Sequence, residues 1–147
     1  MKKRRLSREF AFKFLYQHDA NGLLRSGSVT EFTEDDFERI KDALGENSPP
    51  DRDFARDLAS GICKNIGEID SRIERCSDNW KISRMSPVDI NIMRVAVYEL
   101  LYMEDIDGAV SINEAMEMAA KYGTEKSGSF INGVLDKIKT GEASRNA

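Results

Sequence analysis

Residues 111–136 read SINEAMEMAAKYGTEKSGSFINGVLD, a stretch that combines helical spacing with residues typical of helix ends. Ser111 and Glu114 have the S-x-x-E spacing of a capping box, which predicts that a helix begins at Ser111. Gly123 stands where a residue in the left-handed conformation would end that helix. Apolar and alanine side chains recur at helical spacing, first as Ile112, Ala115, Met116, Ala119 and Ala120, and then as Ile131, Val134, Leu135 and Ile138. The stretch therefore predicts two short helices joined by a turn.

A glycine interrupts the second of these helices. Asn132-Gly133 is typical of a β-hairpin turn, but the helical spacing around it is the stronger signal. Glycine inside a helix costs about 1 kcal/mol relative to alanine. We therefore expect Gly133 to lie in close contact with a neighbouring backbone.

Helical periodicity dominates the rest of the chain, and no β-type alternation persists, so the sequence predicts an all-α protein. The expected helices begin near Leu6 or Ser7 and end at Asn21-Gly22, run from Thr33 to Gly45, run as one long helix from Asp51 to Asp78-Asn79-Trp80, and begin again at Ser86-Pro87. Lys81–Pro87 is then the natural hinge, with Trp80 packed against it. This hinge predicts an N-terminal half of residues 1–80 and a C-terminal half of residues 81–147.

Together with the residues before it, from Val88 onward, this stretch also carries a resemblance to a known family. The matching residues are Arg94, Ala96, Tyr98-Glu99-Leu100, Ile112-Asn113-Glu114-Ala115, Tyr122-Gly123 and Phe130-Ile131-Asn132-Gly133-Val134-Leu135-Asp136. In this order they resemble the C-terminal signature of the NusB family of bacterial transcription antitermination factors. The resemblance implies a compact fold of two small helical bundles.

Basic charge is concentrated at the N-terminus. The chain has 147 residues and a net charge of -4. In its first thirteen residues six cations stand against Glu9 alone, a local charge of +5, so the remainder carries -9. A basic arm on an acidic body indicates a localised site for an anionic polymer.

The first helix has two distinct faces. One is an apolar stripe of Phe10, Ala11, Phe14 and Leu15. The other combines Arg5 and Arg8 with Phe12 and Tyr16. Guanidinium groups pair with phosphate, and aromatic rings stack on unpaired bases or pack against a partner protein. A solvated basic tail with two further core aromatics explains the same pattern, and the residues alone leave both interpretations open.

The resemblance favours RNA contact, because Arg4-Arg5, Arg8-Glu9 and Leu15-Tyr16-Gln17 match the arginine-rich segment with which the family binds boxA in nascent RNA. It implies further RNA contacts near the turn before Phe130, although Ser129 stands where relatives often have a basic residue. The predicted RNA-binding residues are Lys2, Lys3, Arg4, Arg5, Arg8, Phe12, Tyr16, Lys121 and Phe130. Phe130 fits a core position equally well.

The resemblance also implies protein partners. Asp89 matches an acidic position at which the family meets NusE, which is also a ribosomal protein, and Tyr16 is expected to share that surface. An acidic residue in the first turn of a helix is equally expected as a partner of the helix dipole. The complex would join transcribing RNA polymerase and suppress premature termination, notably on ribosomal RNA operons.

Groups suited to catalysis are few. His18 is the only histidine, and its place near a helix end is typical of a capping or surface residue. No phosphate-binding glycine loop, nucleophile elbow or metal-spaced cluster occurs, so we expect neither an enzyme, a cofactor nor a metal site. Cys63 and Cys76 are expected to be reduced thiols. No apolar run approaches the ~18 residues of a membrane span, and a cytoplasmic location is expected.

Two alternative functions remain open. A NusB-like domain also precedes the methyl-donor-binding domain of certain ribosomal RNA cytosine methyltransferases, and the end of this chain at Ala147 favours the free factor. A helical protein-interaction module without RNA binding would be insensitive to removal of the charges on Arg4, Arg5 and Arg8. The sequence does not decide between a monomer and a homodimer.

Overall fold

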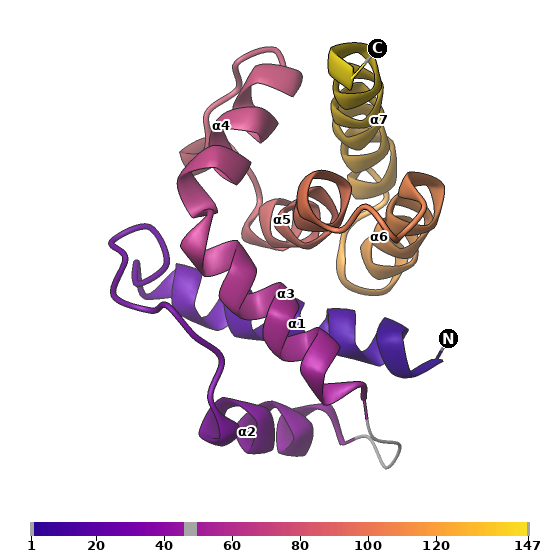
Figure 1. Cartoon of the computed structure of the whole chain (residues 1–147). Coiled ribbons are helices and arrows are strands. Elements are labelled where there is room, and N and C mark those ends of the chain that lie inside the picture. The colour runs from indigo at the N-terminus through magenta and orange to yellow at the C-terminus, as the bar shows by residue number, and fades with distance from the viewer. Residues whose placement is uncertain (1, 46–49, 147) are drawn as a thin grey trace. The chain divides into compact units, whose positions relative to one another are not determined.

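The computed structural model describes residues 2–45 and 50–146, with side chains for 3–45 and 50–141 (Figure 1). This part of the chain contains α-helices and one short 3-10 helix, and no strand. The helices are α1 (Lys2–Ala20), α2 (Glu34–Leu44), α3 (Arg52–Lys64), α4 (Ile66–Cys76), η1 (Ile82–Arg84), α5 (Pro87–Tyr102), α6 (Gly108–Tyr122) and α7 (Ser127–Asn146). The prediction of an all-α protein is confirmed.

Contacts between Cα atoms divide the chain into two compact units, Met1–Ile66 and Gly67–Ala147. This boundary falls inside the stretch for which the sequence predicts one long helix. That expectation is wrong, because the helix breaks at Asn65, which adopts φ -117° and ψ 21°. The Asn65 side chain donates to the Gly61 carbonyl at 2.8 Å and stabilises the end of α3. The division into halves at residue 80 stays a prediction.

In the first unit α1 packs against α3 and α2. Its predicted apolar stripe is confirmed as core, since Phe10, Ala11, Phe14 and Leu15 are all fully buried. The helix begins at Lys2, earlier than predicted. Ser7 does not cap it, because its hydroxyl donates to the Lys3 carbonyl one turn back, at 2.7 Å, and to the Asp51 carbonyl at 2.8 Å. The second bond ties the start of α1 to the residue that caps α3.

Helix α2 begins and ends as its sequence predicts. The Thr33 hydroxyl accepts from the Asp36 amide at 3.2 Å, and the Asp36 carboxylate accepts from the Thr33 amide at 2.9 Å. Gly45 ends the helix in the left-handed conformation with φ 65°. Glycine, which has no Cβ, adopts this conformation at little cost.

In the second unit α5 packs against α6 and α7. Ser86 and Pro87 begin α5 as predicted, and the Ser86 hydroxyl accepts from the Asp89 amide. Arg94 of α5 is fully buried, and its Nε and Nη2 donate to the two carboxylate oxygens of Asp70 in α4, each at 2.8 Å. Such bidentate pairs are strong and directional. This pair therefore fixes α4 on α5.

The predicted start of α6 is wrong by one turn. Asp107 caps the helix by accepting from the Ala109 amide at 3.0 Å. Ser111 lies inside α6, where its hydroxyl donates to Glu99 of α5 at 2.7 Å. The Ser111 hydroxyl is thus used in a buried bond to α5, and Asp107 caps α6 in its place. The S-x-x-E spacing thus marks a contact between α5 and α6.

Gly123 ends α6 as predicted, but the conformation expected of Gly123 and the close contact expected of Gly133 are both wrong. Gly123 ends α6 with φ -96°, outside the left-handed region. A Cβ at this position would lie 2.5 Å from the Ser127 hydroxyl oxygen, so close approach excludes a side chain there. Around Gly133, by contrast, nothing lies within 4 Å of a Cβ, and the expected close contact is absent.

The apolar faces of α6 and α7 are partly as predicted. Ile131, Val134, Leu135 and Ile138 of α7 are all buried, which confirms its core face. In α6 the buried residues include Ala115, Met118 and Ala119, while Ile112 and Met116 are half-buried and Ala120 is exposed. The core stripe of α6 is therefore narrower and rotated relative to the predicted one. In the described part of the chain no helix is long and apolar enough to cross a membrane.

Candidate functional site

The basic residues of the N-terminal arm lie in the first turns of α1. Lys3, Arg4 and Arg5 are exposed, whereas Arg8 is only 5% exposed. The side chain of Lys2 lies outside the described residues. Helix α1 therefore presents three described cations to solvent and holds a fourth against the body of its unit.

Two of these arginines are positioned by one aromatic ring. The guanidinium carbon of Arg4 lies 4.5 Å from the ring centroid of Phe54 in α3, and that of Arg8 lies 5.2 Å from it. A cation over an aromatic face is attracted by the ring quadrupole. Phe54 is itself held at the start of α3, where its amide donates to Asp51 at 3.1 Å. The ring orders both guanidinium groups before any ligand binds.

The contact of Phe54 with Arg4 and Arg8 is not among the features that the sequence predicts. Phe54 is far from the arm in the chain and fits the apolar stripe of its own helix. Only the packing of α1 on α3 brings the two segments together. The sequence carries no local signal for such a contact.

The two aromatic residues of the predicted α1 surface differ in exposure. Tyr16 is 40% exposed, but Phe12 is only 2% exposed. Their ring centroids lie 6.1 Å apart, and the Lys13 ammonium lies 5.9 Å from the centroid of Phe12. Tyr16 can meet a ligand as it stands, whereas contact between Phe12 and a base would require Phe12 to leave its buried position.

Asp89, the predicted partner-binding acid, lies in the first turn of α5 and is half-buried. Its amide donates to Ser86, as expected for a residue at a helix start. Its Oδ1 atom is buried and accepts no hydrogen bond from the described residues. A buried polar atom in this state costs free energy that a partner's donor would recover.

The remaining predicted RNA contacts belong to the second unit. Lys121 is exposed near the end of α6, with its ammonium 5.4 Å from the ring centroid of Tyr122. Phe130 is half-buried in α7 and meets Trp80 edge to face, with ring centroids 5.4 Å apart. Trp80 is 46% exposed, so part of its side chain is covered and part faces solvent, and its role at the hinge stays a prediction. The arm residues and Tyr16 belong to the first unit, and Asp89, Lys121 and Phe130 to the second.

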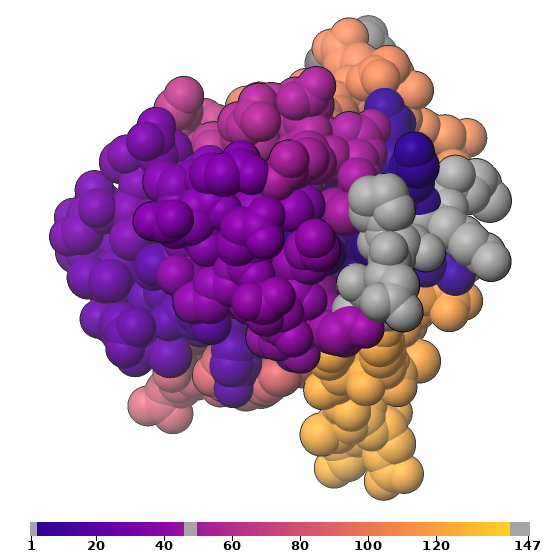
Figure 2. All heavy atoms as spheres, turned by 90° about the horizontal axis from the view of Figure 1, so that it is seen from below, coloured from indigo at the N-terminus to yellow at the C-terminus, as the bar shows by residue number. Residues whose placement is uncertain are grey.

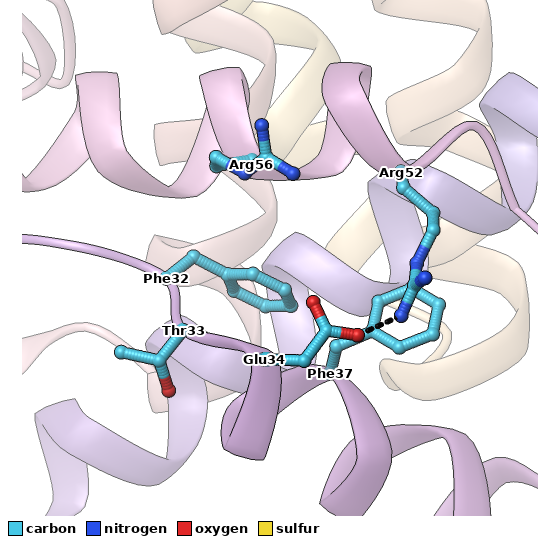
Figure 3. A pocket seen from close by; sticks show the side chains of 6 residues that line it. All are labelled: Phe32, Thr33, Glu34, Phe37, Arg52 and Arg56. Atoms are coloured by element: carbon cyan, nitrogen blue, oxygen red, sulfur yellow. Dashed lines mark hydrogen bonds and ion pairs between the residues drawn. The ribbon is translucent and has the colours of Figure 1, made fainter.

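The pocket between α2 and α3 is too small for a substrate (Figure 3). Its volume of about 20 Å³ is that of a single water molecule. The residues that line it are Phe32, Thr33, Glu34, Phe37, Arg52 and Arg56. Arg52 stacks 3.9 Å from the centroid of Phe37 and pairs with Glu34, as the dashed line shows. These groups are occupied in holding α2 on α3.

Other features typical of catalysis are also lacking in the described residues. No group of three or more potential metal ligands occurs among them. Cys63 and Cys76 are free thiols. The face of α2 and α3 in Figure 2, in purple and magenta, is closely filled with side chains and shows no deep hollow. The described surface features that stand out are instead cationic and aromatic.

Three comparisons agree on the relatives of this chain. The model of the NusB family matches residues 5–140. The transcription antitermination protein NusB of Geotalea daltonii is 43% identical over 145 residues, with 94% of each chain covered.

Solved structures are similar over nearly the whole chain. NusB of T. maritima superposes with a TM-score of 0.73 and 39% identity, covering 93% of this chain and 90% of the other. A crystal structure of the antitermination factors NusB and NusE in complex with dsRNA contains a chain with a TM-score of 0.78 and 28% identity, covering 96% of this chain and 98% of the other. These similarities extend across both units.

Proposed function

This chain belongs to the NusB family, and we propose that it is a non-catalytic transcription antitermination factor that binds single-stranded boxA RNA together with NusE. The observation that carries this proposal is the similarity over 96% of the chain to a protein solved in complex with NusE and dsRNA. In this role the protein joins the elongating RNA polymerase, notably on ribosomal RNA operons. A factor of this kind works in the cytoplasm.

The first contact surface is the start of α1. Its described cations are Lys3, Arg4, Arg5 and Arg8, and Lys2 extends the series. Phosphates of the RNA would meet Arg4 and Arg5 directly. Because Phe54 holds the guanidinium groups of Arg4 and Arg8, less side-chain freedom is lost on binding. Tyr16 offers an exposed ring for a base or for NusE.

The second unit supplies the other proposed contacts. Lys121 and Phe130 would add a phosphate contact and a stacking contact to RNA. Asp89 would bind NusE, and its buried Oδ1, which accepts no hydrogen bond from the described residues, supports a donor from that partner. Each contact surface alone binds weakly. Together they raise each other's occupancy through effective concentration.

Two observations favour an adaptor over an enzyme. The described residues hold no group of three or more potential metal ligands. The relatives from Geotalea daltonii and from the complex with NusE and dsRNA are antitermination factors. The alternatives are a protein-interaction module without RNA binding and a helper domain related to the cytosine methyltransferases.

The proposal is tested by fluorescence anisotropy of a labelled single-stranded boxA RNA titrated with the protein, with and without NusE. Scrambled and double-stranded RNAs of the same length serve as controls. We expect sequence-selective binding that tightens when NusE is present. Failure of every RNA to bind, with NusE present, would favour the protein-interaction module.

The same assay tests the arm. Replacement of Arg4, Arg5 and Arg8 by Ala is expected to weaken binding and to flatten its salt dependence, by about 0.7 in log-log slope for each phosphate of a single strand that the protein no longer neutralises. Replacement of Arg56, an exposed arginine of α3, by Ala is the matched control. An unchanged slope in the triple variant would show that these side chains do not bind phosphate.

A further inference from the structure

Trp80 is the only tryptophan of the chain, and it is 46% exposed. Its ring meets Phe130 edge to face, with centroids 5.4 Å apart. A single exposed aromatic ring needs no explanation by itself, so its significance depends on the groups around it.

The backbone holds Trp80 in this position. Asp78 and Asn79, the two residues before it, both adopt positive φ, at 58° and 62°. The Asn79 amide donates to the Glu74 carbonyl at 2.8 Å, and the Trp80 amide donates to the Ser77 carbonyl at 3.1 Å. Asn and Asp tolerate this conformation better than other residues that carry a Cβ. The indole is thus presented by a fixed turn and not by a loose loop.

A cationic pocket lies between α4 and α7 of the same unit. It has a volume of about 190 Å³ and is lined by Arg72, Arg75, Cys76, Lys137, Ile138 and Gly141. Its lining holds three cations and no carboxylate. Arg72 is largely buried and bonds Glu68 at 3.1 Å, while Arg75 and Lys137 are exposed. This charge favours an anionic occupant.

The pocket and the aromatic pair are continuous along α7. Phe130, Lys137 and Gly141 are seven and four residues apart, so they point within about 40° of one another around the helix. The Lys137 ammonium lies 3.5 Å from Asp78, in the turn that presents Trp80. Helices α4 and α7, which are labelled in Figure 1, both contribute residues to the lining of the pocket. We call it the aromatic–cationic surface, defined by Trp80, Phe130, Arg72, Arg75 and Lys137.

Aromatic rings beside cations are the combination by which proteins hold single-stranded nucleic acid, since bases stack on the rings and phosphates meet the cations. We propose that the aromatic–cationic surface binds an unpaired stretch of RNA that flanks boxA, with a base stacked on Trp80 and phosphates at Arg75 and Lys137. This inference rests on the proposed function, which brings RNA to the chain. Exposed ion pairs such as Lys137 with Asp78 are weak, so phosphate can replace Asp78.

The test compares a short boxA RNA with RNAs that extend it by unpaired nucleotides on the 5′ or the 3′ side. We expect one extended RNA to bind the wild-type protein about tenfold more tightly than the short RNA, as one stacked base would give. Trp80→Ala and the double variant Arg75→Glu, Lys137→Glu should lose this gain and bind the short RNA as wild type does. Trp80→Phe should keep part of it.

Lys139→Glu is the matched control for Lys137→Glu alone, because it makes the same charge change two residues further along α7, on another side of the helix. Thermal unfolding by circular dichroism checks that each variant is folded. If the extended RNAs bind no more tightly than the short RNA, or if the tighter binding persists in Trp80→Ala, the inference is overturned. Binding of the short RNA in the same experiment would still support the proposed function. Loss of NusE binding with normal RNA affinity would instead assign this surface to a protein.

Trp80 fluorescence gives a second readout that does not depend on boxA. Because no other tryptophan is present, quenching by an unpaired oligoadenylate reports stacking on this indole. We expect saturable quenching that Arg75→Glu, Lys137→Glu weakens. Absence of quenching overturns the inference whatever the boxA result, whereas failure of the short boxA RNA to bind contradicts the proposed function.

Discussion

At the scale of single residues, His18 shows how a surface-type prediction can fail. The sequence suggested a capping or surface role, but both ring nitrogens are buried and form no hydrogen bond with the described residues. The ring lies edge-on to Phe14, with centroids 4.6 Å apart, and Nε2 lies 3.9 Å from Asp36. Burial lowers the pKa of His18 below its ordinary value of 6.5, and the nearby Asp36 offsets this only in part.

This environment makes stability depend on pH. Since the pKa of His18 is lower in the folded state, the unfolded state binds the proton more readily. The free energy of unfolding should therefore be greatest above pH 6.5 and fall as the pH falls below that value. His18→Gln should remove this contribution, so that urea titrations between pH 7.5 and 5.5 give a flatter profile than wild type. Parallel profiles would contradict the assignment.

Asp36 acts in a separate, more acidic window. Burial alone would raise its pKa, but the bonds from the Thr33 amide and from Arg39, at 2.9 and 2.7 Å, outweigh this, and the pKa lies below its ordinary 3.8. Its contribution to stability is present above pH 3.8 and is lost as the pH falls further. The titration of Asp36 therefore lies outside the range between pH 7.5 and 5.5 in which the stability of His18→Gln is measured.

At the scale of elements, the turn from α6 to α7 requires glycine at position 123 because there is no room for a Cβ, and not because the residue adopts the left-handed conformation. The Thr124 amide donates to the Ser127 hydroxyl at 2.9 Å, which draws Ser127 against Gly123. A Cβ on residue 123 would meet this hydroxyl at 2.5 Å and the Ala119 carbonyl oxygen at 2.8 Å. Real Cβ atoms do not approach so closely, so the turn must move if residue 123 is larger.

Gly123→Ala should therefore lower the free energy of unfolding by about 1–3 kcal/mol, the usual cost of overpacking. Gly133→Ala is the matched control, since it lies inside α7 with nothing within 4 Å of the new Cβ. It should raise stability by up to about 1 kcal/mol through helix propensity. Equal effects of the two substitutions in urea unfolding would show that crowding at Gly123 is not the cause.

At the scale of the whole molecule, the proposed function requires residues from both units. The arm and Tyr16 belong to residues 1–66, while Asp89, Lys121 and Phe130 belong to residues 67–147. Each unit has its own helix contacts, with α1 on α3 in the first and α5 on α6 and α7 in the second.

Asp89→Lys tests whether Asp89 binds NusE. The new charge at a half-buried helix start should impair NusE binding, because repulsion replaces a carboxylate that can accept from the partner. Binding of boxA RNA alone should be unchanged, as should the circular dichroism spectrum. Glu117→Lys, at an exposed position of α6 in the same unit, is the control. Normal NusE affinity in Asp89→Lys would remove Asp89 from the interface.

The sequence by itself determined the helical class, the apolar stripes of α1 and α7, the caps of α2 and α5, and the concentration of basic charge at the N-terminus. These features follow from periodicity, capping chemistry and charge, which act within a few residues of each other. The family signature added the expected partners.

Which side chains are exposed, and which partners they contact, follows only from the packing of the helices. The Ser111 hydroxyl bonds Glu99 of another helix, Phe54 orders Arg4 and Arg8 from another helix, and Phe12 is buried while Trp80 is exposed. Each outcome depends on contacts between residues far apart in the chain. Hydrogen-bond partners and burial are set by that packing, so no local pattern could specify them.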